Sequence, residues 1–171
     1  NIVSLDCYDG PGFFNSFYDN IKNKDLLKNS NCYLPKDSIV GRILEHKENI
    51  IVVDSSGNGI WQHDIFTWYV DKYNIIKYDN LSSGSNAIYE TLKNMIDLTT
   101  ASQRKIFFDS IFSLIYSTGK DSFKEVSLLK SIPKLLSTYK NFDENDRKLV
   151  NKFIVEFIKT YIINYGKNLT K

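Results

Sequence analysis

The sequence predicts an α+β protein with a small antiparallel sheet and one N-terminal helix, followed by an antiparallel bundle of about four helices. Short β-branched and aromatic runs, separated by Gly, Asn and Pro turns, fill residues 1–80. Apolar residues at helical spacing fill residues 86–166. The polar segment 81–85 joins the two parts, and a length of 171 residues suits one domain over residues 1–171.

The first expected elements are a strand and a helix. The run from Ile2 to Tyr8 is apolar and β-prone, and the turn residues of segment 9–12 end it. Aromatic and aliphatic residues then recur every three or four positions, which predicts one amphipathic helix over residues 12–28.

An antiparallel meander is expected next. Residues 38–44 have the composition of a strand, and the β-branched run 50–53 predicts a buried strand. The Gly- and Asn-containing segment 54–59 predicts a turn, because these residues tolerate positive φ angles. Residues 60–62 are expected to pair back against the preceding strand.

The segment 63–78 fits two patterns. Its apolar residues have helical spacing at the start, but the same residues also have the composition of a strand. We expect a short helix or turn near 63–69 and a strand near 74–78.

Four helices are expected in the second half, over residues 86–98, 100–119, 122–136 and 143–166. Thr100 with Gln103, and Ser122 with Glu125, form the capping-box pattern of a helix N-terminus. Pro133 lacks a backbone donor and should kink or split the third helix. Acidic residues at the start of the fourth helix favour its N-terminus.

The search for catalytic groups yields little. Of the two histidines, His46 lies in a polar turn, and His63 precedes Asp64. Adjacent residues of a strand point to opposite faces, so this His–Asp neighbourhood does not make a catalytic pair. The acidic residues are scattered and no phosphate-binding glycine loop is present, so we expect no metal, no cofactor and no enzymatic activity.

The cysteines and the hydropathy set further limits. Cys7 and Cys32 match no zinc or redox spacing and are expected to be small buried residues, with a disulfide between them as the alternative. No apolar run approaches the ~18 residues of a membrane helix, so we expect no membrane partner. Asn1 suggests either that a leader was cleaved or that earlier residues are missing.

Charge differs between the two halves. Residues 1–80 hold 11 acidic and 8 basic residues, a net charge of −3, and residues 81–171 hold 9 acidic and 14 basic residues, a net charge of +5. The basic residues alternate with apolar ones, as on an ordinary solvated helix face. We therefore expect no nucleic acid as partner.

Aromatic residues concentrate in the acidic half, where six fall between Trp61 and Tyr78. Trp and Tyr gather at protein interfaces, and interleaved acidic residues suit a basic partner. At least half of these aromatics are expected to belong to the core. The expected partner-binding residues are Glu45, Glu48, Asp54, Trp61, Asp64, Trp68, Tyr69, Asp71 and Tyr73.

The stretch that runs from Gly41–Leu44 to Trp61–Trp68 is the part of the chain that most suggests a known class of proteins. The chain resembles the immunity proteins of bacterial toxin–immunity pairs, including those of contact-dependent growth inhibition. This resemblance implies a cytoplasmic protein that binds a cognate toxin, often a nuclease, and occludes its active site. Many nuclease inhibitors are strongly acidic, whereas this chain has a net charge of +2, so charge complementarity would be confined to the first half.

Three alternatives stay open. The chain could be a small enzyme that uses His63 with a nearby carboxylate, or an RNA-binding regulatory protein that uses its basic C-terminal helices. It could also be a secreted effector, which a Cys7–Cys32 disulfide would favour.

Overall fold

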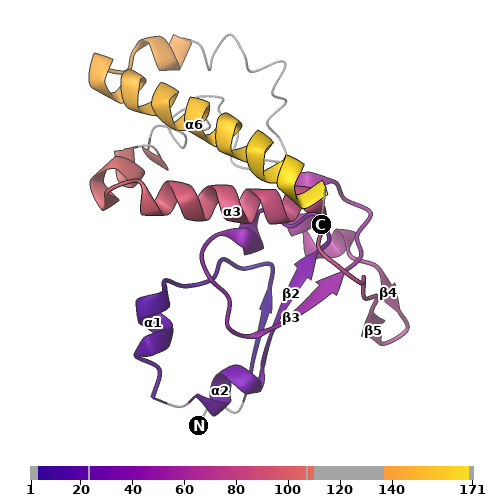
Figure 1. Cartoon of the computed structure of the whole chain (residues 1–171). Coiled ribbons are helices and arrows are strands. Elements are labelled where there is room, and N and C mark those ends of the chain that lie inside the picture. The colour runs from indigo at the N-terminus through magenta and orange to yellow at the C-terminus, as the bar shows by residue number, and fades with distance from the viewer. Residues whose placement is uncertain (1–3, 23, 107, 110–136, 170–171) are drawn as a thin grey trace. The chain divides into compact units, whose positions relative to one another are not determined.

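The structure is a computed structural model of the whole chain, and it describes residues 4–22, 24–106, 108–109 and 137–169 (Figure 1). The chain forms two compact units. The first comprises residues 1–93 together with 161–171, and the second comprises residues 94–160.

The main sheet of the first unit has three parallel strands in the order β1-β2-β3. These strands are β1 (Leu5–Tyr8), β2 (Ser30–Pro35) and β3 (Asn49–Val53). Cys7 of β1 lies opposite Cys32 of β2 in the register. The centre of the sheet is its most buried part, because β2 is flanked on both sides and Val53 ends β3 in the core.

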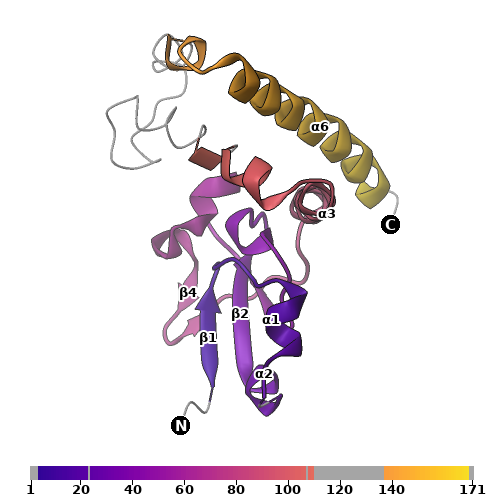
Figure 2. The ribbon, with the colours of Figure 1, turned by 90° about the vertical axis from the view of Figure 1, so that its left-hand side faces the viewer.

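Parallel strands require crossover connections, which here span residues 9–29 and 36–48. The first carries the helices α1 (Asn15–Asp19) and α2 (Asp25–Lys28), and the second carries the 3₁₀ helix η1 (Val40–Arg42). Both views show α1 and α2 on one side of the sheet (Figures 1 and 2). Tyr18 anchors α1: it is fully buried, and its hydroxyl donates to the carbonyl oxygen of Glu45 at 2.9 Å.

After β3 the chain forms two 3₁₀ helices and a small hairpin. The helices are η2 (Gly59–His63) and η3 (Ile65–Thr67), and the Asp64 side chain caps η3 by accepting from the Phe66 amide. Strands β4 (Val70–Asp71) and β5 (Asn74–Ile75) pair antiparallel.

Two long helices follow, α3 (Ser83–Asp97) and α6 (Glu144–Leu169), and each has residues in both units. The Asp143 carboxylate accepts a hydrogen bond from the backbone in the first turn of α6 at 2.8 Å. The capping box before the helical residues 101–106 is confirmed. The Gln103 amide donates to the Thr100 hydroxyl at 3.2 Å, and the Thr100 amide donates back to the Gln103 side chain at 3.0 Å.

The α+β class is confirmed, but the predicted arrangement is wrong. The main sheet is parallel rather than antiparallel, and the antiparallel pairing is confined to the two-stranded β4–β5 sheet. The composition of a strand does not encode its direction. The prediction also lacks strand β2 and pairs residues 38–44 with the strand at 50–53 instead.

Three segments take a form other than the predicted one. The expected helix over residues 12–28 is two short helices, because Asn20 ends α1 by donating its side-chain amide to the Ser16 carbonyl at 2.7 Å. Residues 38–44 form η1 instead of a strand, and residues 60–62 lie in η2. In these two segments Ser38 and the Gly41 amide bind the Asp9 side chain, and the Gln62 side chain is buried, which favours turns over strands.

Other elements are confirmed. The strand at 50–53 and the helices at 86–98 and 143–166 correspond to β3, α3 and α6. The expected helix over residues 122–136, with its kink at Pro133, lies outside the described residues, as does the end of the helix that starts at residue 100.

Candidate functional site

The carboxyl ends of the three parallel strands hold a group of polar side chains. Asp9 directly follows β1, Ser38 lies three residues after β2, and Asp54 directly follows β3. In open sheets with parallel strands, ligands bind outside the carboxyl ends of the strands. The topology therefore places this cluster where a binding site is expected.

Asp9 is the centre of the cluster. It is almost fully buried, and its φ angle of 50° lies in the left-handed region, which Asp tolerates better than most residues. Its Oδ1 atom accepts from the Ser38 hydroxyl at 2.5 Å and from the Gly41 amide at 3.1 Å. A buried carboxylate held this firmly, with a backbone angle of this kind, is typical of functional sites.

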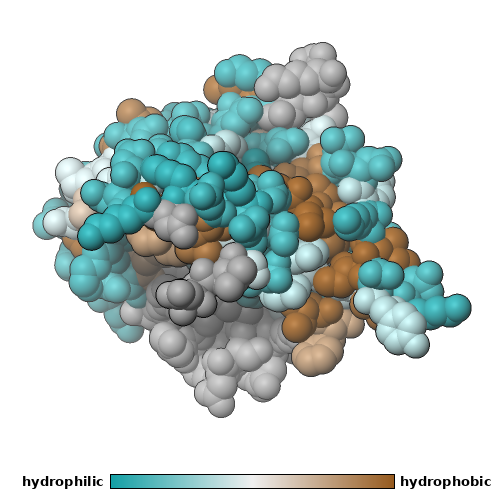
Figure 3. All heavy atoms as spheres, turned by 90° about the horizontal axis from the view of Figure 1, so that it is seen from below, coloured by the Kyte–Doolittle hydropathy of each residue, from teal (hydrophilic) through white to brown (hydrophobic). Residues whose placement is uncertain are grey.

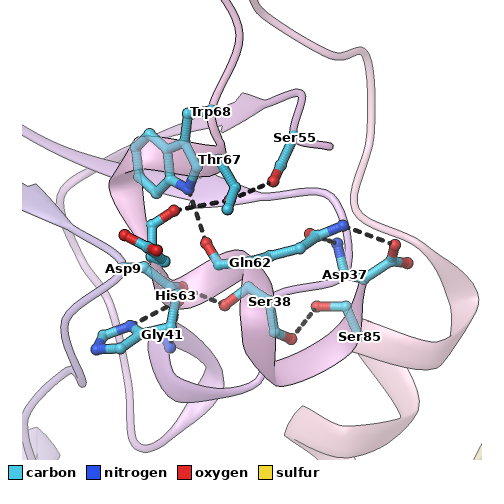
Figure 4. A network of polar contacts seen from close by, with 11 residues as sticks. Asp9, Asp37, Ser38, Gly41, Ser55, Gln62, His63, Thr67, Trp68 and Ser85 are labelled. Atoms are coloured by element: carbon cyan, nitrogen blue, oxygen red, sulfur yellow. Dashed lines mark hydrogen bonds and ion pairs between the residues drawn. The ribbon is translucent and has the colours of Figure 1, made fainter. Parts of the chain in front are cut away.

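The imidazole of His63 contacts Oδ2, the other carboxylate oxygen of Asp9. Its Nδ1 atom lies 3.0 Å from Oδ2 of Asp9, although the two residues are 54 positions apart (Figure 4). The Asp9 side chain is 1% exposed and the His63 side chain 49% exposed. When Asp9 is ionised its carboxylate only accepts, so Nδ1 of the neutral His63 ring then carries the proton and Nε2 presents its lone pair on the outer side of the ring. In the described part of the chain, Nε2 has no hydrogen-bond partner.

The surroundings of Asp9 oppose its ionisation. Burial raises the pKa of the Asp9 carboxyl above its ordinary value. The hydrogen bonds from Ser38, His63 and the Gly41 amide act in the opposite direction, as does the attraction between Asp9 and His63. Whether Asp9 is ionised at a given pH therefore depends on the balance between its burial and these three hydrogen-bond donors.

Gly41 is required by the close approach of the chain to Asp9. A Cβ atom at this position would lie 2.4 Å from Oδ1 of Asp9 and 2.3 Å from Cδ2 of Leu34. It would also lie 3.0 Å from the Ser38 hydroxyl oxygen. The carbonyl of Ser38 accepts from the Ser85 hydroxyl at 2.9 Å, which links the cluster to the start of α3.

A second set of hydrogen bonds fixes η2, which carries His63. The Gln62 side chain is buried and binds both ends of Asp37: its amide donates to the carboxylate at 3.1 Å, and its oxygen accepts from the backbone amide at 2.9 Å. It also donates to the Gly57 carbonyl at 2.9 Å. The Trp68 indole donates to the Gln62 carbonyl at 2.7 Å. These contacts hold the His63 ring in place beside Asp9 (Figure 4).

The arrangement supplies two of the three groups of a hydrolytic triad. A buried carboxylate that orients a half-exposed imidazole through Nδ1 is the pair that activates a nucleophile in such enzymes. Ser38 does not complete it, because its hydroxyl is buried on the far oxygen of Asp9 rather than on Nε2 of His63. Within the described ranges no group of three or more His, Cys, Asp or Glu side chains is placed to hold a metal ion.

Two of the predicted partner-binding residues bind within the chain. The Glu45 carboxylate accepts from Lys93 and from the Tyr89 hydroxyl, each at 2.6 Å, and these contacts lower the pKa of Glu45. The Glu48 carboxylate accepts from the Tyr18 hydroxyl at 3.1 Å. The structure keeps Glu45 and Glu48 apart from the other predicted residues and engages both in internal hydrogen bonds.

Two further predicted residues are not fully exposed: Asp54 is half-buried and Trp68 is buried. Asp54 is half-buried and accepts from the Ser55 amide at 2.9 Å. Trp68 is only 7% exposed and supports Gln62, as described above.

The remaining five predicted residues define what we term the aromatic surface: Trp61, Asp64, Tyr69, Asp71 and Tyr73. They come from η2, the cap of η3, the residue before β4 and the β4–β5 hairpin. The three aromatic members are exposed, and Tyr73 at the hairpin turn is 95% exposed. Hydrophobic residues gather on one part of the face seen from below, among hydrophilic ones (Figure 3).

The comparisons with known proteins identify a family. The family model Mbeg1-like matches residues 1–113, about two thirds of the chain. The chain belongs to the Mbeg1-like family. The matched segment contains Asp9, Ser38, Gly41 and His63. The searches of curated proteins and of solved structures found no match.

The pairing of His63 with Asp9 was not predicted, because the carboxylate lies 54 positions away in the chain rather than next to His63. The available signal was the position of Asp9 directly after a strand.

Among the described residues, none of the helices is both long enough and apolar enough to span a bilayer.

Proposed function

We propose that this Mbeg1-like chain is an acid–base enzyme in which His63 transfers protons at the carboxyl edge of the parallel sheet. The observation that carries the proposal is the 3.0 Å contact between Nδ1 of the half-exposed His63 and the buried Asp9 carboxylate. This proposal follows the small-enzyme alternative of the sequence analysis, with Asp9 in place of the neighbouring Asp64.

The mechanism assigns different roles to the two residues. His63 is the catalytic residue, because its Nε2 lone pair takes a proton from water or from a substrate hydroxyl placed against it. The positive charge then formed on the imidazole is stabilised by Asp9, the positioning residue that fixes the tautomer and the ring. His63 afterwards returns the proton from Nε2 to the leaving group.

The test is hydrolysis of a panel of p-nitrophenyl esters by the parent chain, His63→Gln and Asp9→Asn. General acid–base catalysis contributes roughly 10²–10⁴-fold, so His63→Gln should lose that factor in kcat/KM. Asp9→Asn should also lose activity, mainly in kcat, because the ring remains but its tautomer changes. Asp71→Asn is the matched control, since Asp71 is an exposed acidic residue of β4. Equal rates for the parent chain and His63→Gln would refute the proposal.

A second candidate function is the one that the resemblance to immunity proteins implies: binding and neutralisation of a cognate basic toxin in the cytoplasm. The exposure of Trp61, Tyr69 and Tyr73 favours it, because a few aromatic anchors can dominate a protein interface. Phe66, 92% exposed, extends the apolar part of the same segment. The nearby Asp71 is exposed and would speed the capture of a basic partner.

This second function has its own test. The tagged chain is used to capture a partner from the lysate of its organism, in parallel with Trp61→Ala and Tyr73→Ala. A basic polypeptide that is toxic when expressed alone, and that both variants fail to retain, would support neutralisation through the aromatic surface. Equal retention by the parent chain and both variants would contradict it.

A further inference from the structure

The two cysteines lie side by side in the parallel sheet. Cys7 of β1 and Cys32 of β2 are direct partners in the register, and both are free thiols. Neighbouring strands are ~4.8 Å apart, which falls inside the range of Cα–Cα distances that a disulfide tolerates, about 4.4–6.8 Å. Side chains of direct partners leave the sheet on the same face, so the two sulfur atoms point the same way.

The two thiols also influence each other, because burial and the neighbouring Cys7 thiol both raise the pKa of Cys32. On its other side Cys7 is crowded by the turn after β1, because a Cβ atom at Gly10 would lie only 2.7 Å from the Cys7 sulfur. This packing leaves little room on the turn side of Cys7.

We propose that Cys7 and Cys32 form a disulfide between β1 and β2 when the chain meets a small disulfide oxidant such as oxidised glutathione. The order of events follows from exposure, since Cys7 is partly exposed and Cys32 is fully buried. The Cys7 thiolate attacks one sulfur of the oxidant, forms a mixed disulfide and releases one glutathione. The Cys32 thiolate then attacks the Cys7 sulfur, forms the protein disulfide and releases the second glutathione.

The reaction balances without another reagent. Two protein thiols are oxidised, one glutathione disulfide is reduced, and the two protons lost by Cys7 and Cys32 are taken up by the two glutathione thiolates. Burial raises the pKa of the Cys32 thiol, and the neighbouring Cys7, Glu48 and Asp9 act in the same direction. The second step should therefore become faster as the pH rises.

The location gives this disulfide a consequence for the site. Cys7 lies two residues before Asp9, and Cys32 lies on the strand that leads to Ser38. A covalent bond between β1 and β2 would pin together the strands that position Asp9 and its hydroxyl partner.

The experiment incubates the reduced full-length chain with oxidised glutathione and quenches it with acid. The remaining thiols are then alkylated with N-ethylmaleimide in denaturant and counted by intact mass spectrometry. We expect the parent chain to lose both maleimide sites, retain no glutathione, stay monomeric on a non-reducing gel and yield a peptide that links Cys7 to Cys32. Its urea midpoint should rise and should return to the reduced value after dithiothreitol.

Matched variants separate the two steps. Cys32→Ser should accumulate one stable glutathione adduct on Cys7, whereas Cys7→Ser should keep its buried thiol unmodified in the folded chain. Cys32→Ala is the second variant in case a buried hydroxyl prevents folding, and circular dichroism checks that each variant is folded. A parent chain that keeps two free thiols, retains glutathione on Cys7 or forms only disulfide-linked dimers would overturn the proposal.

Discussion

Gly41→Ala tests the packing on which the Asp9 site depends. The added methyl group would meet Leu34 at 2.3 Å and Asp9 at 2.4 Å, both inside the core. Overpacking of a core costs about 1–3 kcal/mol. Displacing the buried carboxylate from its donors adds about 1–3 kcal/mol, because the carboxylate cannot turn to water. We therefore expect the free energy of unfolding to fall by roughly 2–6 kcal/mol.

The assay is equilibrium unfolding in urea, followed by circular dichroism, with Gly166→Ala as the matched control. Gly166 lies exposed in α6, and a Cβ atom there meets nothing within 4 Å. The control should be neutral or stabilise the chain by up to about 1 kcal/mol, because Ala favours a helix over Gly. A loss below about 0.5 kcal/mol in Gly41→Ala, the size of an ordinary surface effect, would refute this account of the packing.

Three further predictions concern stability. Burial raises the pKa of Asp9 above 3.8, so the stability this group contributes is complete below pH 3.8 and declines as the pH rises through the raised value. Asp9→Asn should remove that decline from urea unfolding curves recorded from acidic to neutral pH, and an unchanged slope would contradict the shift. Thr100→Ala should cost about 1 kcal/mol by removing the cap, whereas Thr100→Ser should retain most of it in thermal unfolding. Trp68→Phe leaves the Gln62 carbonyl without its buried donor and should cost about 1–3 kcal/mol in urea, and no change would show that this bond contributes nothing.

Local signals in the sequence predicted part of the fold correctly. The β-branched run became β3, the apolar periodicity became α3 and α6, and the Thr100–Gln103 capping box forms as expected. These features depend on residues close together in the chain. Their patterns are therefore visible without knowledge of the tertiary structure.

The parallel sheet was not predictable in the same way. Strand β2 (Ser30–Pro35) begins with polar residues and ends in proline, so it lacks the β-branched pattern that marks β3. The direction of a strand depends on where its neighbours lie, which no local pattern records. The pairing of Asp9 with His63 depends on the same topology, because Asp9 follows β1 and His63 reaches it from η2, 54 positions later in the chain.

The candidate partner-binding residues were chosen from composition and charge, and the fold gives them different surroundings. At least half of the six aromatic residues from Trp61 to Tyr78 were expected in the core, but Trp68 alone among them is buried. Glu45 and Glu48 were chosen for their charge, but each is engaged by a partner far away in the sequence. Composition predicts which residues can bind a partner, and only the fold decides which of them are free to do so.

The central claim is that Asp9 orients the His63 ring, and long-range ¹H–¹⁵N NMR on histidine-labelled chain tests it most directly. The chain has only two histidines, so His63→Gln assigns the signals. We predict that the neutral His63 ring carries its proton on Nδ1 in the parent chain and in the control Asp71→Asn, and shifts toward the Nε2-protonated form in Asp9→Asn. A parent ring protonated on Nε2, or the same tautomer in the parent chain and Asp9→Asn, would contradict the account.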